Sequence, residues 1–202
     1  MKLMIIGHAR HGKDTVCEIL RDQYGLTFRS SSEAAAERVI YPIMRDAYGY
    51  STIEECLNDR ANHRSAWYQL IREYNTPDLA RLAREIYSEN DIYCGLRHAE
   101  EFEAIKAAGL FDYCIWVDAS QRHPAEPASS CSLTRSHADF VLDNNGTPEE
   151  LQANIAHMIR WMHALNGNVC KCGAEQKTQD EIEFLGWHGH CVACAMQEVG
   201  HG

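Results

Sequence analysis

The chain has 202 residues, which is enough for one well-buried domain and a small appendage. Hydrophobic residues make up 45% of it and charged residues 24%, the balance of a globular protein. The formal net charge of -10 argues against a nucleic-acid binder that relies on a broad basic surface, but it leaves room for a local basic cleft.

The predicted elements alternate between strands and helices. Strands are predicted over residues 3–6, 91–96, 112–119 and 138–144, and helices over 13–24, 30–49, 51–74, 76–88, 97–109 and 147–167. In the helix over 76–88, Thr76 is the predicted cap and Pro77 the first helical residue. Residues 120–137 contain two prolines and no apolar periodicity, so we expect an irregular loop there. Strands separated by helices predict an α/β fold with a parallel sheet.

The N-terminus runs from Met1 and Lys2 directly into the first apolar strand, and no small-residue cleavage site follows. No apolar run reaches the roughly twenty residues that cross a bilayer. We therefore expect a cytoplasmic protein without a signal peptide or a membrane span.

Residues 7–13, GHARHGK, match the pattern G-x-x-x-x-G-K between a predicted strand and a predicted helix, the context that a phosphate-binding loop requires. The glycines let successive backbone N–H groups point at one phosphate, and the helix N-terminus adds a favourable dipole. Lys13 is the predicted catalytic cation at the β- and γ-phosphates of ATP. The predicted ATP-binding residues are Gly7, His8, Ala9, Arg10, His11, Gly12, Lys13, Asp14 and Thr15. A glycine-rich turn that only connects a strand to a helix is the alternative.

The residue after the lysine departs from the usual pattern. Asp14 stands where such loops carry Ser or Thr, and its carboxylate can hold Mg²⁺ directly or through water. The stretch Gly12-Lys13-Asp14-Thr15 resembles the nucleoside monophosphate kinase group of P-loop proteins, in particular the phage deoxynucleoside monophosphate kinases, and the resemblance extends over about residues 1–160. It implies a P-loop NTPase-type three-layer fold, with ATP and Mg²⁺ as cofactors.

A kinase needs a second pocket for the acceptor, and in such sheets the carboxyl ends of the strands line it. Arg97 ends the strand predicted over 91–96 and resembles the strand-end arginine of the same kinases, which makes it a catalytic candidate. Arg122 is a second catalytic candidate because it lies in the irregular segment where related kinases carry a lid. The candidate substrate contacts are Ser31, Arg64, Tyr68, Arg72 and Arg135. Helix-capping serines and solvated arginines are the alternatives.

Asp118 ends the strand predicted over 112–119. It is placed either to bind Mg²⁺ through water or to accept a proton from an acceptor hydroxyl, and a cap of the following loop is the alternative. An acceptor phosphate oxygen is already anionic and needs no base, whereas an alcohol does. The presence of a base therefore bears on the identity of the acceptor.

Four cysteines near the C-terminus form the pairs Cys170-x-Cys172 and Cys191-x-x-Cys194, with eighteen residues between the pairs. This spacing predicts a structural Zn²⁺ site with four thiolates. Two disulfides or free thiols are the alternatives, and His188 or His190 could replace one cysteine. The remaining cysteines are read as small core residues: Cys17, Cys56, Cys94, Cys114 and Cys131.

A domain boundary is predicted near Gly167-Asn168. It separates a P-loop kinase-like domain, residues 1–167, from a four-cysteine zinc module, residues 168–202. The aromatic residues Phe184 and Trp187 of this module are typical of zinc modules that grip nucleic acid, whereas a stabilising lid or a homodimer contact is the alternative role.

Phage genomes with hypermodified thymidine encode a P-loop kinase related to the deoxynucleotide kinases. The loop GHARHGKDTV and the zinc module resemble that branch, as does GLR, in which Gly95 and Leu96 replace the family's usual aspartate before the arginine. The resemblance implies ATP-dependent phosphorylation of the hydroxymethyl group of 5-hydroxymethyluracil in DNA, in the host cytoplasm. The alternatives are a deoxynucleoside monophosphate kinase that acts on free nucleotides and, from another class, a non-catalytic P-loop ATP-binding protein.

Overall fold

The computed structural model describes residues 1–167, 170, 172, 174, 176, 178–188 and 190–199, with the side chains at 164–167, 179, 183, 186, 187, 195 and 197–199 excepted. The chain divides into two compact units, Met1–Asn145 and Gly146–Gly202. The long helix that follows Asn145 thus belongs to the second unit, whereas the boundary predicted from the sequence falls after it. Asn168 of that predicted boundary lies outside the described residues, so the assignment of residues 1–167 and 168–202 stays a prediction.

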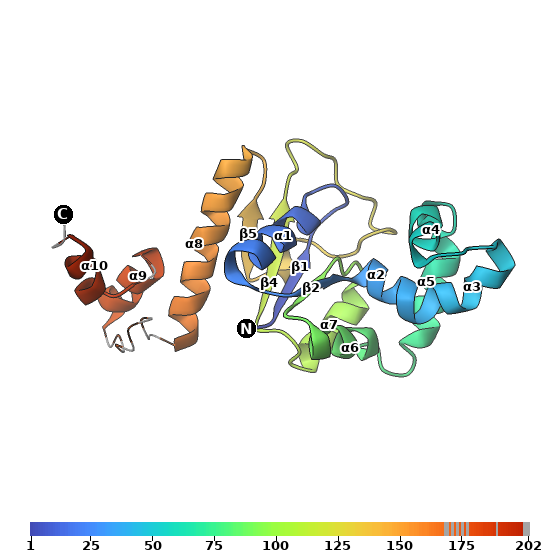
Figure 1. Ribbon diagram of the computed structural model, residues 1–202, viewed down its shortest axis with the longest axis horizontal. Helices are drawn as coiled ribbons and strands as arrows, with labels where there is room; N and C mark the ends of the chain where they lie inside the picture. Colours follow the sequence, from blue (N-terminus) through green and yellow to red (C-terminus); the bar gives the residue numbers. More distant parts are fainter. Residues whose placement is uncertain are drawn as a thin grey trace. The chain divides into compact units, whose positions relative to one another are not determined.

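Five parallel strands form one sheet in the first unit, in the order β2-β3-β1-β4-β5 (Figure 1). They are β1 (Leu3–Ile6), β2 (Phe28–Ser30), β3 (Ile92–Cys94), β4 (Tyr113–Asp118) and β5 (Phe140–Asp143). Leu3 of the central strand lies opposite Ile92 on one side and Tyr113 on the other. The predicted parallel α/β sheet is confirmed, and the carboxyl ends of its strands meet at one edge, where such sheets bind ligands.

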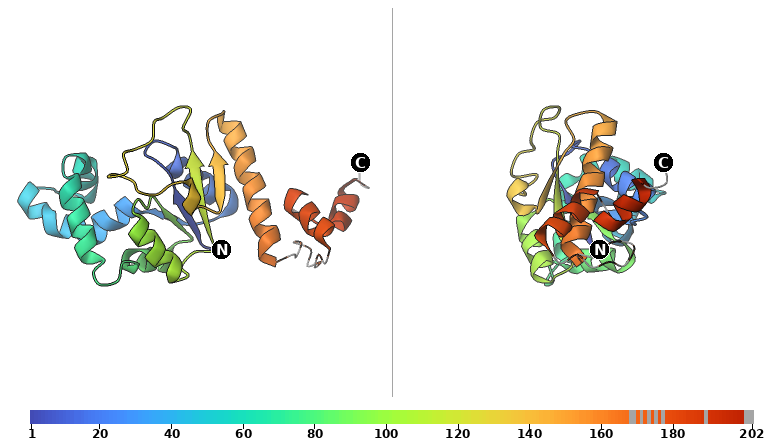
Figure 2. Two further views of the ribbon diagram at one scale, coloured as in Figure 1. Left: turned by 180° about the vertical axis from the view of Figure 1, so that it is seen from behind. Right: turned by 90° about the vertical axis from the view of Figure 1, so that its left-hand side faces the viewer.

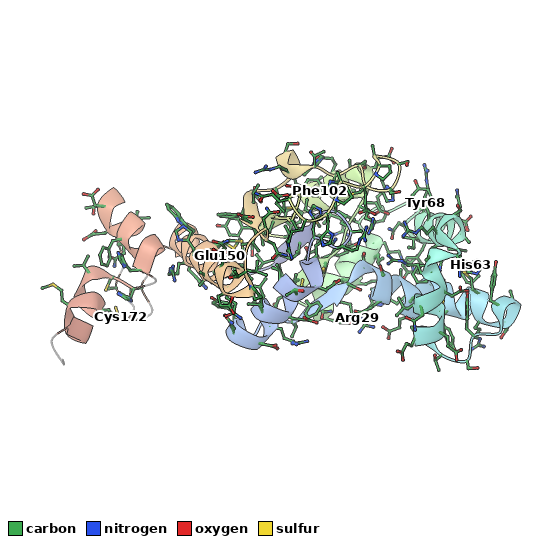
Figure 3. The ribbon with its side chains drawn as sticks, turned by 90° about the horizontal axis from the view of Figure 1, so that it is seen from above. Arg29, His63, Tyr68, Phe102, Glu150 and Cys172 are labelled. Atoms are coloured by element: carbon green, nitrogen blue, oxygen red, sulfur yellow. The ribbon has the colours of Figure 1, made fainter. Side chains whose placement is uncertain are left out.

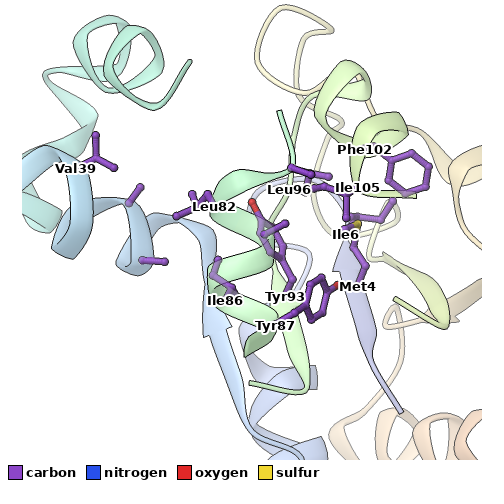
Figure 4. Packing of buried hydrophobic residues seen from close by; sticks show 14 of the residues in the cluster. Met4, Ile6, Val39, Leu82, Ile86, Tyr87, Tyr93, Leu96, Phe102 and Ile105 are labelled. Carbon is purple, nitrogen blue, oxygen red and sulfur yellow. The ribbon is translucent and has the colours of Figure 1, made fainter. Parts of the chain in front are cut away.

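The hydrophobic core explains why β1 reads as an unbroken apolar run. All four of its residues are fully buried, as is usual for a strand of a parallel sheet with helices on both faces. Figure 4 shows Met4 and Ile6 packed in a cluster with Tyr93, Phe102 and Ile105. The five scattered cysteines are all buried and free, which confirms that they are core residues: Cys17, Cys56, Cys94, Cys114 and Cys131.

The helices of the first unit are α1 (Lys13–Tyr24), α2 (Ser31–Ala35), α3 (Tyr41–Tyr48), α4 (Ile53–Asn58), α5 (Arg64–Tyr74), α6 (Arg81–Glu89) and α7 (Ala99–Ala107). A π-helical turn, Ala36–Ile40, joins α2 to α3, and short 3-10 turns lie at Asp59–Ala61 and Arg135–His137. Helices α3, α4 and α5 gather to one side of the sheet, as the view from behind also shows (Figure 2). The strand predicted over 91–96 is β3, and the helix predicted over 97–109 follows it as α7.

Three sequence predictions need correction. The helix predicted over 51–74 is interrupted between α4 and α5. The strand Phe28–Ser30 was not predicted, because three half-buried residues carry no periodic pattern. The helix predicted to begin at Thr76 and Pro77 begins at Arg81 instead, since Asp78 accepts hydrogen bonds from the N–H groups of Ala80 and Arg81 and forms a turn before it.

The second unit contains α8 (Pro148–Gly167), α9 (Gln179–His188) and α10 (Val192–Val199). Thr147 caps α8: its hydroxyl accepts from the N–H of Glu150, whose carboxylate accepts from the N–H of Thr147 in return. Thr178 and Glu181 repeat the arrangement at the start of α9. No helix in the described part of the chain is long and apolar enough to cross a membrane.

Candidate active site

The loop between β1 and α1 has the backbone that phosphate binding needs. Gly7 has φ 144°, and a Cβ there would lie 2.7 Å from the carbonyl oxygen of Val117. Gly12 has φ 87°, and a Cβ there would collide with the side chain of Asn144. Gly12 also precedes α1 without any side-chain cap, so the first N–H groups of the helix remain available to an anion.

A buried histidine and an asparagine hold the loop from its inner side. His11 is fully buried, and its Nδ1 accepts from the N–H of Ala119 at 3.1 Å. The Asn144 amide donates to the carbonyl oxygen of His11 at 2.9 Å. Both contacts come from the ends of β4 and β5, so the neighbouring strands fix the loop before any ligand arrives. Such preorganisation lowers the entropic cost of binding.

The side chain of Lys13, the first residue of α1, points back to the phosphate loop that precedes it. Its Nζ donates to the carbonyl oxygen of His8 at 2.7 Å. Burial lowers the pKa of the Lys13 ammonium, with the positive charge of Arg97 acting in the same direction. A partly desolvated cation beside the uncapped first N–H groups of α1 is suited to bind a polyphosphate.

A carboxylate from the irregular segment already lies against this loop. Oε2 of Glu126 accepts from the N–H of Ala9 at 2.6 Å, and Oε1 pairs with Arg97 at 2.7 Å. The N–H of Glu126 donates to Nδ1 of His8 at 3.3 Å. Burial alone would raise the pKa of the Glu126 carboxyl, but the hydrogen bonds from Arg97 and Ala9 outweigh it, and the pKa is lowered. Glu126 is therefore an ionised group bound by the same donors that would bind a phosphate.

Arg97 also lines a pocket of about 390 Å³, the size of a site for a small ligand. The pocket lies between the ends of β2 and β3 and the helices α5 and α7, and Tyr68 on α5 is labelled in Figure 3. Its lining combines apolar and aromatic side chains with serines and arginines: Ser31, Ser32, Arg60, Arg64, Trp67, Tyr68, Ile71, Leu82, Tyr93, Leu96, Arg97, His98 and Glu101 among them.

The guanidinium groups of this pocket repel one another. Burial lowers the pKa of Arg60, and the charges of Arg97 and Arg64 lower it further. Arg60 donates to the hydroxyl of Ser32. Within the first unit, all of whose residues are described, neither Arg60 nor Arg64 forms an ion pair. Seven other arginines do: Arg21, Arg29, Arg38, Arg45, Arg81, Arg84 and Arg97.

The structure brings some of the predicted acceptor residues together. Arg97, Ser31, Arg64 and Tyr68 line the pocket. Ser31 is tied to the end of β3, because its hydroxyl donates to the carbonyl oxygen of Gly95 at 3.0 Å. Asp14 lies in the first turn of α1, exposed and beside Thr15, so these two residues are placed to hold a Mg²⁺ ion near the loop.

Other predicted residues lie outside the pocket lining. Arg72 donates to the hydroxyl of Tyr68 at 3.3 Å. Arg122 donates to the carbonyl oxygen of Asn144, and Arg135 is exposed in a 3-10 turn. Asp118 ends β4, where its carboxylate accepts from the N–H of Ser120 at 3.2 Å. Asp118 directly follows Val117, which contacts Gly7, so it flanks the phosphate loop rather than the acceptor pocket.

Four residues of the pocket and the loop were not predicted from the sequence: Arg60, Trp67, Glu101 and Glu126. Arg60 lies four residues before Arg64 within the helix predicted over 51–74, so the i, i+4 spacing of a helix contained a signal for Arg60. Glu126 is the one acidic residue between two prolines in the irregular segment. Glu101 gave no signal, because acidic residues are common on helix surfaces.

The four C-terminal cysteines form a second candidate site, within the second unit. Their Sγ atoms all lie within 4.8 Å of one another. Cys170 and Cys194 are 3.8 Å apart at sulfur, and Cys172 and Cys191 are 3.7 Å apart. A disulfide needs about 2.05 Å, whereas Zn–S bonds of about 2.3 Å in a tetrahedron place sulfurs roughly 3.8 Å apart. The geometry thus fits a metal rather than two disulfides.

Local hydrogen bonds favour a thiolate in this cluster. N–H groups of Cys172 and Cys191 lower the pKa of Cys170 to about 6. Thiolates are the form that binds Zn²⁺, and four of them leave no open position for catalysis. His188 and His190 lie beside Phe184, in ring contacts of 4.2 and 6.5 Å, outside the four-sulfur cluster. The side chain of Trp187, the other predicted aromatic contact, lies outside the described residues.

No family model and no curated protein matches the chain. Among solved structures, the chain is similar to a shikimate kinase from Aquifex aeolicus, with 15% identity and a TM-score of 0.47 over 81% of this chain and 98% of that one. It is also similar to a gluconokinase from Sinorhizobium meliloti, with 14% identity and a TM-score of 0.39 over 82% of this chain and 97% of that one.

Proposed function

We propose that the protein is an ATP-dependent phosphotransferase whose acceptor is the hydroxymethyl group of 5-hydroxymethyluracil in phage DNA. The observation that carries the proposal is a pocket with unpaired arginines that shares Arg97 with a phosphate-binding loop. A protein of net charge -10 has abundant carboxylates to neutralise its arginines. Leaving Arg60 and Arg64 unpaired is favourable when the ligand brings the negative charge, as a nucleotide phosphate does.

The pocket supports a nucleotide acceptor in particular. Its volume suits one nucleotide, and a base in DNA would therefore have to leave the stack to enter it. Aromatic side chains of Trp67, Tyr68 and Tyr93 offer faces on which a base can stack. Tyr68 and His98 already make a ring contact at 4.9 Å.

The residues of the chain divide the work of phosphoryl transfer between them. The loop N–H groups and Lys13 would bind the β- and γ-phosphates, and Asp14 with Thr15 would hold Mg²⁺, which neutralises phosphate charge when bound. Arg97 lies between the loop and the pocket, where it would contact the transferred group. For an alcohol acceptor, Asp118 remains the candidate that takes up the hydroxyl proton, and Arg122, close to the end of β5, would support the surrounding segment.

Free deoxynucleoside monophosphates are the second candidate acceptors. Arg60, Arg64 and Arg97 would bind a phosphomonoester no less readily than a DNA phosphodiester. The pocket volume suits a mononucleotide, which needs no base extrusion to enter. The attacking phosphate oxygen would then need no base. A non-catalytic ATP-binding protein is the lesser alternative, because it leaves the arginine-lined pocket without a ligand.

One assay separates these functions. The purified protein receives labelled ATP together with an oligonucleotide that contains 5-hydroxymethyluracil and with free deoxynucleoside monophosphates. We expect label on the DNA that survives denaturation and is removed by phosphatase, and none on an otherwise identical thymine oligonucleotide. Label that enters only free nucleoside diphosphates would establish the second candidate, and ATP hydrolysis without either product would establish the third.

A further inference from the structure

A buried thiol contacts the exposed carboxylate at the start of α1. Sγ of Cys94 lies 3.5 Å from Oδ1 of Asp14, although the two residues are 80 positions apart in the chain. Cys94 ends β3 and is 1% exposed, whereas Asp14 lies exposed in the first turn of α1, which packs against β3. Since an ionised carboxylate can only accept, the thiol is the donor of this hydrogen bond.

The surroundings of Cys94 keep its sulfur in the form that can donate. A hydrogen bond with Cys17 and burial raise the pKa of the Cys94 thiol well above its usual range. Both cysteines are free and buried. A thiol packs in the core as a small hydrophobic group and still carries a donor, so Cys94 can serve the sheet and the carboxylate together.

The second oxygen of Asp14 is available to a ligand. In the first unit, which the structure describes completely, Asp14 forms no other hydrogen bond and no ion pair. Burial lowers the pKa of Lys13 and of Arg60, and the negative charge of Asp14 opposes this at both residues. The carboxylate thus lies within reach of the phosphate loop and of the acceptor pocket. A cation bound to the phosphates of ATP is needed in that neighbourhood.

An aspartate needs to be oriented where a serine or threonine would not. A hydroxyl ligand has one oxygen, whereas the carboxylate of an exposed aspartate turns about χ2 with little resistance. A hydrogen bond from the rigid sheet to one oxygen fixes the direction of the other. Partners of this kind, one step removed from the metal, orient its ligands and tune its affinity.

We propose that Cys94 is a positioning residue for the Mg²⁺ ion, which donates to Oδ1 of Asp14 and so directs Oδ2 towards the cation. This rests on the ATP- and Mg²⁺-dependent part of the proposed function, and it does not depend on which acceptor is used. It also gives the buried thiol at the end of β3 a role beyond packing.

Equilibrium binding tests the proposal without turnover. A non-hydrolysable ATP analogue is titrated into the full-length protein by calorimetry, once in excess Mg²⁺ and once in excess EDTA. The ratio of the two dissociation constants reports the gain from Mg²⁺, and comparison between variants cancels the binding of Mg²⁺ to the free analogue. Cys94→Ala should reduce this gain by about 10-fold, at the lower end of the 10- to 100-fold that loss of such a partner costs. Cys94→Ser keeps a donor and should retain the wild-type ratio, whereas Asp14→Ala should lose the gain.

Two controls separate positioning from packing. Cys114→Ala truncates an equally buried thiol on β4, so it should lower the melting temperature as Cys94→Ala does while keeping the wild-type ratio. In the Asp14→Ala background, Cys94→Ala should change the ratio no further, because the two residues act through one contact. If Cys94→Ala does not fold, Cys94→Val removes the donor without leaving a cavity.

Several results would overturn the proposal: a wild-type ratio in Cys94→Ala, Cys94→Val or Asp14→Ala, an equal loss in Cys94→Ser, or a further loss in the Asp14→Ala background. The phosphotransferase function fails separately. If the ratios behave as expected but no acceptor is phosphorylated, that function is wrong and the positioning role stands. If phosphate is transferred and Cys94→Ala keeps the wild-type ratio, the positioning role is wrong and the function stands.

Discussion

Glu126 competes with ATP for the phosphate loop, so its removal should strengthen ATP binding. Its carboxylate accepts from the N–H of Ala9 and pairs with Arg97. An incoming phosphate needs the N–H of Ala9, which donates to one anion only, and it would also compete with Glu126 for Arg97. ATP must therefore displace Glu126 before it can reach the loop N–H group of Ala9.

The contacts themselves set the magnitude. The side chains of Glu126 and Arg97 are only 14% and 28% exposed, so water screens this pair less than an ordinary surface ion pair. A hydrogen bond to a charged group contributes about 1.5–3 kcal/mol net. The loss of even one of the two bonds thus costs ATP roughly 10- to 100-fold in affinity. Glu126→Ala removes this cost, and we expect its Kd for ATP to fall by at least 10-fold.

Calorimetric titration of ATP into the acceptor-free protein measures the effect. Glu126→Gln should give a smaller gain, because its amide oxygen still accepts from Ala9 but carries no charge for Arg97. Since the pKa of Glu126 is lowered, the carboxylate is ionised throughout the neutral range, and the gain should not vary between about pH 6 and 8. Glu103→Gln should bind ATP as the wild type does. Unchanged or weaker ATP binding by Glu126→Ala would refute competition and indicate that the carboxylate helps to hold bound ATP.

Four further outcomes are expected. Lys13→Ala should abolish phosphoryl transfer with an unchanged circular dichroism spectrum, because it removes several kcal/mol of charge stabilisation at the transferred phosphate; near-normal turnover would contradict this. Asp118→Asn should lower turnover sharply with little change in the Kd for ATP, and equal turnover would show that Asp118 is not the base. Arg60→Ala and Arg64→Ala should each raise the KM for the acceptor. For single-stranded DNA, each should also reduce the slope of the logarithm of the binding constant against the logarithm of salt concentration by about 0.7, and an unchanged slope would show that this arginine does not bind a DNA phosphate. The chain should bind one Zn²⁺, measurable by elemental analysis, and the double variant Cys191→Ser, Cys194→Ser should lose it. Zinc retained by this variant would show that these two cysteines are not its ligands.

The phosphate loop was predictable because its signal is local. Glycine spacing, the preceding strand and Lys13 lie within eleven residues, so the sequence contains the whole geometry. Helix α1 begins at Lys13 and ends at Tyr24 as predicted, since Gly12 and Gly25 both adopt left-handed conformations at its ends. Cysteine spacing was similarly local, and the four sulfurs do converge.

The acceptor pocket was only partly predictable because distant segments form it. Arg97 could be selected from its place at a strand end, but its partner Glu126 lies 29 residues further along, in a segment without periodicity. Glu101, which also lines the pocket, accepts a hydrogen bond from Asn75, which lies 26 residues earlier in the chain. Trp67, on the pocket-lining helix α5, was not selected from the sequence, and the folded chain places it in the buried wall of the pocket. Contacts of this kind, between residues far apart in the sequence, can be recognised only in the folded chain.

The shared use of Arg97 couples the two halves of the site. While Glu126 holds Arg97, the pocket offers Arg60 and Arg64 as its unneutralised guanidinium groups. If a phosphate took the place of the carboxylate, Glu126 would leave and Arg97 would pair with that phosphate at the border of the acceptor pocket. Because the phosphate that would replace Glu126 is itself anionic, this exchange adds no positive potential, and Arg60 and Arg64 remain the groups that would attract an anionic acceptor. An acidic protein can in this way remain a weak binder of polyanions and still keep positive charge at the place of transfer.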